Sequence, residues 1–262
     1  MGFTKTSDEL ARYFDFGARQ FVGAQMMGVM FQTKPEIVAR LLPPPLEPTG
    51  MPGGLIFIAQ YPETNLGPGY REAALYLNCQ YAGEMGTYCL SMPIDSEPNR
   101  MHNGRDIFGL PKKMASIHLE REDKRVYGYV ERLGVRFVEI ELTLSGELEQ
   151  VPPTGPSFTF KASPRIDLTP GFDGPVLLCR QQTDVAMKRF EIGMPQVTLR
   201  PSVADPWAEV EIENVMIGFF MLSDNTMQPG SVVAEVEAES FVPYYFKMTD
   251  FNVGDGKDGG ND

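Results

Sequence analysis

The feature that most constrains the fold of this chain is the alternation of apolar and polar residues with a period of two. It is clearest in residues 135–144 (VRFVEIELTL), where Val138, Ile140 and Leu142 share one face. The other face ends in the carboxylates of Glu139 and Glu141. Turns rich in glycine and proline separate such segments, and many short strands joined by turns indicate a curled antiparallel sheet or β-barrel. The other predicted strands are residues 54–60, 73–81, 87–92, 207–213, 215–222 and 231–239.

Two helices are expected before these strands. Residues 6–9 (TSDE) form a capping box, and apolar residues follow at roughly helical spacing as far as Phe21. A second capping box at residues 33–36 (TKPE) leads into another apolar stretch, which the prolines at 43–45 end. The expected fold class is therefore α+β, mainly antiparallel β, with a few flanking helices.

Charge and composition exclude several classes of partner. The 262 residues include 35 acidic and 23 basic side chains, which gives a formal net charge of −12. Because nucleic-acid backbones and anionic membranes are bound mainly by lysine and arginine, we expect neither as a partner. No apolar run reaches the length of about 18 residues that a membrane-spanning helix needs.

The cysteines and histidines argue against a disulfide framework and against a metal site. Cys79, Cys89 and Cys179 are odd in number and lie among apolar residues, as expected for buried thiols of a cytoplasmic protein. The two histidines, His102 and His118, do not occur in a clustered Cys/His pattern, so no zinc site is predicted.

Residues 102–115 (HNGRDIFGLPKKMA) place a glycine-bounded turn and a proline before the adjacent Lys112 and Lys113. A lysine amine is a nucleophile only when neutral, and its free pKa of about 10.4 leaves almost none neutral near pH 7. Burial or a nearby cation lowers that pKa, and the neutral amine then attacks a ketone to form an imine. By itself, Pro-Lys-Lys is also compatible with a solvated turn.

The wider context favours the functional interpretation. Residues 104–113 (GRDIFGLPKK) resemble the signature of the acetoacetate decarboxylase family, in which the first lysine after the proline forms the imine. Supporting family-like segments are residues 42–47 (LPPPLE), 70–72 (YRE), 95–98 (DSEP) and 170–174 (PGFDG). The resemblance implies one domain over residues 1–253, a small keto-acid substrate, no cofactor and a homo-oligomer. Residues 254–262 are expected to be a disordered tail.

The resemblance implies that Lys112 and Glu72 are the catalytic residues. Glu72 would shuttle protons near the imine, whereas without the resemblance it is equally an edge glutamate in water or paired with Arg71. In an extended segment, Lys112 and Lys113 project to opposite faces, so Lys113 should stay in water and pair with an acid outside the pocket. Desolvation, rather than the charge of Lys113, should then keep Lys112 neutral.

Further residues are expected around the lysine. Arg105 could hold a substrate carboxylate or cap the backbone, and Tyr245, in a predicted late strand, could supply a proton. The apolar residues expected to desolvate the amine are Phe57, Met92, Phe108 and Leu110.

The chain also departs from the family pattern. Residues 24–26 (AQM) stand where the decarboxylases carry an arginine, and Phe57 stands where they carry an additional glutamate. Three interpretations therefore remain: a Schiff-base decarboxylase of β-keto acids, an aldolase or dehydratase acting on pyruvate-type keto acids through the same lysine, and a non-catalytic barrel that binds a small ligand. A structural or assembly protein is the least supported.

Overall fold

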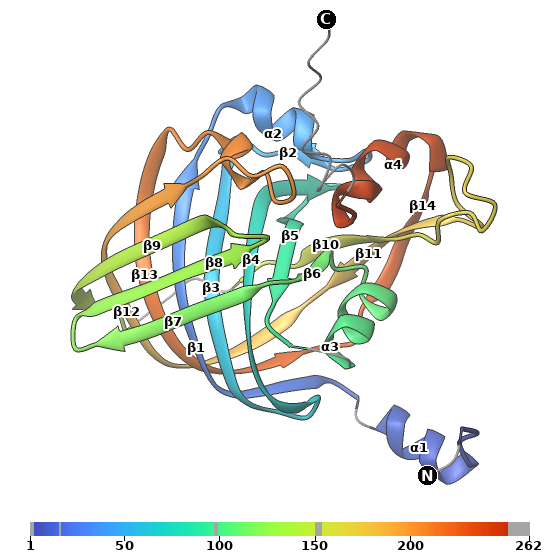
Figure 1. The fold of residues 1–262 in the computed structure, drawn as a ribbon, viewed down its shortest axis with the longest axis horizontal. Helices are drawn as coiled ribbons and strands as arrows, with labels where there is room; N and C mark the ends of the chain where they lie inside the picture. The colour runs from blue at the N-terminus through green and yellow to red at the C-terminus, as the bar shows by residue number, and fades with distance from the viewer. Residues whose placement is uncertain (1–2, 16, 97–98, 150–153, 251–262) are drawn as a thin grey trace, which may run out of the picture.

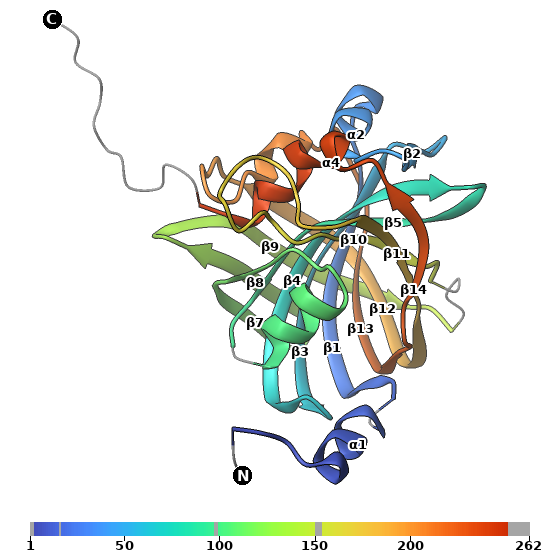
Figure 2. The ribbon, with the colours of Figure 1, turned by 90° about the vertical axis from the view of Figure 1, so that its right-hand side faces the viewer.

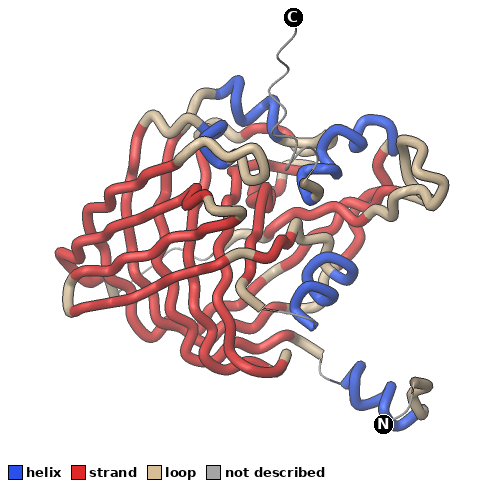
Figure 3. The backbone as a smooth tube through the Cα atoms, in the orientation of Figure 1, coloured by secondary structure: helices blue, strands red, loops and turns tan. Residues whose placement is uncertain are grey.

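The computed structural model describes residues 3–15, 17–96, 99–149 and 154–250, and it is built around one strongly curled sheet (Figure 1). The predicted tail at residues 254–262 lies outside the described residues. Strands make up most of the described chain, and the few helices lie at the ends and edges of the sheet (Figure 3). None of the helices in the described part has the length and apolar character that a bilayer crossing requires.

The elements have the following bounds. The strands are β1 (Arg19–Gln32), β2 (Glu47–Pro48), β3 (Gly53–Thr64), β4 (Gly67–Tyr81), β5 (Glu84–Ile94), β6 (Lys112–Met114), β7 (Ser116–Glu122), β8 (Arg125–Arg132), β9 (Val135–Glu147), β10 (Ser157–Lys161), β11 (Val176–Gln181), β12 (Thr183–Leu199), β13 (Asn214–Met227) and β14 (Ser231–Val236). The helical segments are α1 (Ser7–Asp15), α2 (Pro35–Leu41), α3 (Asn99–Met101), η1 (His102–Ile107), η2 (Trp207–Val210), α4 (Ala238–Tyr245) and η3 (Phe246–Met248).

The sheet curls without closing. Its main path runs β14-β11-β10-β5-β4-β3-β1-β13-β12-β9-β8-β7, with β2 paired to β4 and β6 paired to β5. Most neighbours are antiparallel, but β10 and β6 both run parallel to β5, so the sheet is mixed. Figure 2 shows α2 and α4 at one end of the curl and α1 beyond the other. The predicted curled, mainly antiparallel sheet with flanking helices is confirmed.

Three local predictions are wrong. Residues 207–213 begin with the short helix η2 instead of a strand, and the left-handed φ of 42° at Glu211 ends that helix. Phe21 belongs to β1 instead of the first helix. The last predicted strand ends at Val236, because the Glu237 side chain accepts hydrogen bonds from two backbone N–H groups and caps α4. In addition, Tyr245, also expected in a late strand, lies at the end of α4.

The strands β3 and β4 bury side chains on both faces. Ile58 and Leu75 belong to the larger apolar core, which also includes residues of β1, β8 and β9. Phe57 and Ala74, which are neighbours in the strand register, belong to a second apolar cluster on the opposite face. Leu110, which follows η1, packs into this second cluster, so that face of the sheet is covered.

Candidate active site

The short strand β6 positions both lysines of the sequence motif. It pairs in parallel with β5, where Lys112 lies opposite Met92 and Lys113 opposite Pro93. The preceding helix η1 packs against the first lysine: a Cβ on Gly104 would overlap the Cδ and Cε atoms of Lys112. Glycine at position 104 is therefore what leaves room for the extended lysine side chain.

Lys112 and Glu72 form a buried pair. The two residues are 4% and 6% exposed, respectively, and the Lys112 amine donates a hydrogen bond to Oε2 of Glu72. Tyr70 donates its hydroxyl to the same oxygen at 3.4 Å. Burial raises the pKa of Tyr70 well above its usual value, and the nearby Glu72 raises it further, so this phenol stays protonated and remains a donor. The carboxylate thus lies between an amine and a hydroxyl.

The apolar residues expected around Lys112 gather in one cluster on this sheet face, and the lysine amine contacts a carboxylate. Phe57, Met92 and Leu110 belong to the buried second cluster, and the partly buried Phe108 packs against it. The amine inside this apolar region also contacts the Glu72 carboxylate. The expectation that desolvation does most to keep Lys112 neutral stays a prediction.

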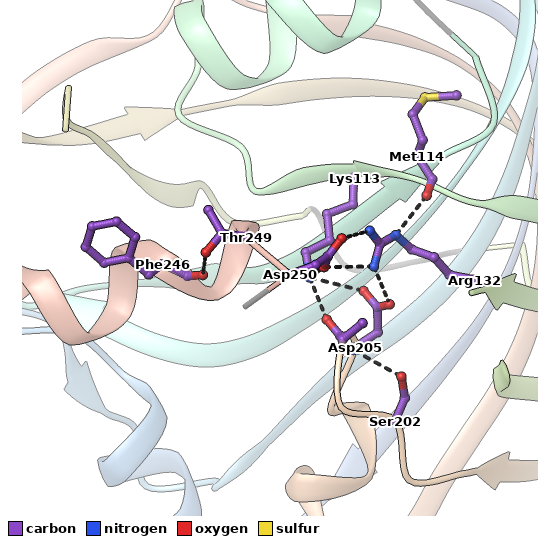
Figure 4. A network of polar contacts seen from close by, with 9 residues as sticks. Lys113, Met114, Arg132, Ser202, Asp205, Phe246, Thr249 and Asp250 are labelled. Atoms are coloured by element: carbon purple, nitrogen blue, oxygen red, sulfur yellow. Dashed lines mark hydrogen bonds and ion pairs between the residues drawn. The ribbon is translucent and has the colours of Figure 1, made fainter. Parts of the chain in front are cut away.

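Lys113 follows Lys112 in β6 and therefore projects to the opposite face of the strand. Its amine lies among acidic groups (Figure 4). Its amine donates to the carbonyl oxygen of Ala204 at 2.5 Å and lies 3.4 Å from Asp205 and 3.2 Å from Asp250. Arg132 pairs with the same two carboxylates. The opposite orientation and the acidic partners agree with the prediction, but Lys113 is only 8% exposed, so the expected external, wet setting is wrong.

Arg105 and Tyr245 lie together at a different place. Both line a cavity of about 730 Å³, and so do Met101 and Gly109, whereas Lys112 is not among its lining residues. Burial raises the pKa of Tyr245, while the positive charge of Arg105 lowers it in part. The cavity flanks η1 and therefore borders the segment that covers the lysine, but the structure does not bring these two side chains into contact with Lys112.

A third lysine in this region, the half-buried Lys247, was not predicted. It belongs to η3, and its amine donates to the hydroxyl of Tyr88 and lies 4.3 Å from the centroid of that ring. Burial lowers the pKa of Lys247 to about 7, and the nearby Cys89 opposes this slightly. Burial also raises the pKa of Cys89 to about 12. Lys247 and Pro111 line the same small cavity, so this amine lies near the predicted lysine motif.

Lys247 should make stability depend on pH. Its pKa is about 7 in the folded protein and about 10.4 when unfolded, so the unfolded chain binds more protons between these values. The free energy of unfolding should therefore rise with pH from about 7, by about 2 kcal/mol near pH 9. Urea denaturation of the wild type and of Lys247→Met at both pH values measures this rise, which the variant should lose.

The exposed Lys124, at the turn between β7 and β8, provides the control for that experiment. The Lys124→Met variant should keep the wild-type dependence on pH. If Lys247→Met and the wild type gain the same stability between the two pH values, Lys247 does not have the lowered pKa described above.

Two buried ionisable groups in contact on an otherwise apolar sheet face make this region the candidate active site. Within the described ranges, no group of three or more His, Cys, Asp or Glu side chains is placed to hold a metal ion. The family model for acetoacetate decarboxylase (ADC) matches residues 3–236. The chain belongs to the acetoacetate decarboxylase family, as its sequence motifs suggest, and is an acetoacetate decarboxylase-like enzyme.

Individual relatives agree with this assignment. Acetoacetate decarboxylase from Burkholderia cenocepacia is 26% identical over 237 residues, which cover 86% of this chain and 92% of the relative. The crystal structure of acetoacetate decarboxylase from Legionella pneumophila has a TM-score of 0.74 at 22% identity. The match covers 84% of this chain and 88% of the Legionella chain. The enduracididine biosynthesis enzyme MppR complexed with pyruvate has a TM-score of 0.73 at 19% identity. The match covers 83% of this chain and 91% of the MppR chain.

Proposed function

We propose that this enzyme is a cofactor-independent lyase that forms a Schiff base between Lys112 and a small keto acid, which it decarboxylates. The observation that carries the proposal is the contact between the buried Lys112 amine and Glu72 within an apolar sheet face. Membership of the acetoacetate decarboxylase family supports it. The pair supplies a nucleophile and a proton acceptor at one point, which imine formation requires.

The ion pair determines how the reaction begins. Glu72 accepts a proton from the Lys112 ammonium, and the neutral nitrogen then bonds to the ketone carbon of the substrate. The protonated carboxyl of Glu72 returns the proton to the carbinolamine oxygen, which leaves as water and gives the imine. Glu72 thus acts as base and then as acid, so the resting ion pair is compatible with catalysis.

Decarboxylation follows from the chemistry of the imine. A protonated imine attracts the electron pair of the bond between the α-carbon and the carboxylate. When that bond breaks, carbon dioxide leaves and the electron pair forms an enamine. Protonation of the enamine carbon and hydrolysis of the imine release the product ketone and regenerate the Lys112 amine.

Aldol condensation or dehydration of pyruvate-type keto acids through the same imine is the second candidate. Ala24 and Phe57, at or next to the positions where the family's decarboxylases carry charged groups, belong to the apolar cluster around the site. MppR, whose fold is similar, has been solved in complex with pyruvate. The two candidates differ in which bond to the α-carbon breaks, so release of carbon dioxide from acetoacetate separates them.

Borohydride trapping tests the proposal because it reduces an imine to a stable secondary amine. Incubation with acetoacetate, pyruvate or butanone, followed by reduction and peptide mass mapping, should place the adduct on Lys112, and Lys112→Met should remove it. Lys247→Met is the matched control, since it removes the amine whose pKa is lowered to about 7 and should keep the adduct. An adduct on Lys247 would overturn the assignment of Lys112, and binding of these ligands without any adduct would indicate a non-catalytic binding protein.

The proposal includes a cytoplasmic homo-oligomer. The three free cysteines Cys79, Cys89 and Cys179 are all buried, which suits a reducing compartment. The open sheet leaves β14 and β7 as edge strands, and edges of this kind are often covered by another copy of the chain. These features support the cytoplasmic location and the oligomer.

A further inference from the structure

Arg100 is a buried cation outside the predicted set of site residues. It belongs to α3, directly before η1, and is 4% exposed. Its guanidinium carbon lies 4.7 Å from the centroid of the Tyr70 ring. Among the described residues, its Nε and Nη2 atoms have no hydrogen-bond partner. A buried charge is normally paired and hydrogen-bonded. This guanidinium therefore has unused N–H donors that could bind an anionic ligand.

Tyr70 connects this cation to the proposed active site. The Lys112 amine lies 5.7 Å from the centroid of the ring that Arg100 contacts. The Tyr70 hydroxyl donates to Glu72, which in turn accepts from Lys112. The connected side chains Lys112, Glu72, Tyr70 and Arg100 thus include two bases and one carboxylate. When these three groups are ionised, the net charge is positive, and an anionic ligand would balance it.

We infer that Arg100 binds the carboxylate of the keto-acid substrate while Lys112 reacts with its ketone. A guanidinium is suited to this task because its planar N–H groups match the two oxygens of a carboxylate. Arg100 thereby makes the enzyme select keto acids over uncharged ketones. The inference rests on the proposed function, since it assumes an imine at Lys112, and it assigns the carboxylate to Arg100 instead of Arg105.

Selectivity between an acid and a ketone is the property to measure. Rates of borohydride-trapped adduct formation at Lys112 are compared for acetoacetate and butanone, which share a reactive ketone but differ in charge. Arg100→Met should lower the ratio of the two rates at least 10-fold, because a charge-assisted hydrogen bond contributes about 1.5–3 kcal/mol. The rate with butanone should stay near that of the wild type, which shows that the fold and the lysine are intact.

Two further variants make the test specific. Arg100→Lys keeps the charge without the planar fork and should give an intermediate ratio, which also covers the case in which Arg100→Met does not fold. Arg105→Met examines the competing arginine, which lines the neighbouring cavity. An unchanged ratio in the Arg100 variants, or a ratio lost only in Arg105→Met, overturns the inference. If the wild type traps neither compound, the proposed function itself fails.

Discussion

Replacement of Glu72 by glutamine is expected to slow imine formation at Lys112 by about 100-fold or more, the usual effect of removing a general acid or base. Glutamine has nearly the same shape as glutamate and can still accept a hydrogen bond from the amine. It cannot accept the ammonium proton or return it to the carbinolamine. The measurement is the rate of borohydride-trapped adduct with acetoacetate at neutral pH.

The opposite result is informative, because the carboxylate has two opposing effects. It removes the proton during the reaction, but at rest it holds the Lys112 amine in a hydrogen bond. If Glu72→Gln accelerates adduct formation, the carboxylate only restrains the amine and the proton shuttle is wrong. Glu84→Gln is the matched control, since Glu84 pairs with Arg180 at an exposed turn and should leave the rate unchanged.

The period-two pattern predicted most of the sheet because side chains on one sheet face share one environment. In β9, Val138, Ile140 and Leu142 are fully buried, while Glu141 on the other face pairs with Arg125. The pattern failed at residues 207–213, where Trp207 is buried against Phe137 without belonging to a strand. Large apolar residues mark burial, but they do not distinguish a strand from a short helix that packs on the core.

The pairing of Lys112 with Glu72 could not be derived from periodicity. The two residues lie on β6 and β4, which flank β5: Glu72 is opposite Ile94 and Lys112 is opposite Met92. This register depends on the whole sheet, so only the family resemblance brought the two residues together in advance. The resemblance did not specify their direct contact, and burial alone suggested a neutral amine instead of an ion pair.

Lys247 and Arg100 were missed for a related reason. Their importance depends on burial against the distant aromatic residues Tyr88 and Tyr70, which the local sequence does not reveal. Lys247 lies beyond residues 3–236, which the family model matches, so the resemblance could not identify it either. The half-buried Lys247 has the lowered pKa that the sequence had indicated for Lys112.

The largest effect on stability is expected at Lys113. Its amine lies between Asp205 and Asp250, and Asp205 is only 3% exposed. Replacing Lys113 with methionine removes one of the two cations that neutralise these carboxylates and leaves Arg132 alone to do so. Breaking a buried ionic network in this way should lower the free energy of unfolding by about 3 kcal/mol, as measured by urea denaturation.

The same variant should leave the chemistry of Lys112 nearly unchanged. Lys113 points to the opposite side of β6, and its charge is balanced by acidic groups, so it contributes little to the electrostatic environment of Lys112. The rate of adduct formation should therefore stay within about twofold of the wild-type rate under conditions where the variant is folded. A tenfold slower reaction in a protein of unchanged stability would show instead that the neighbouring charge, and not the pair with Glu72, controls the reactive amine.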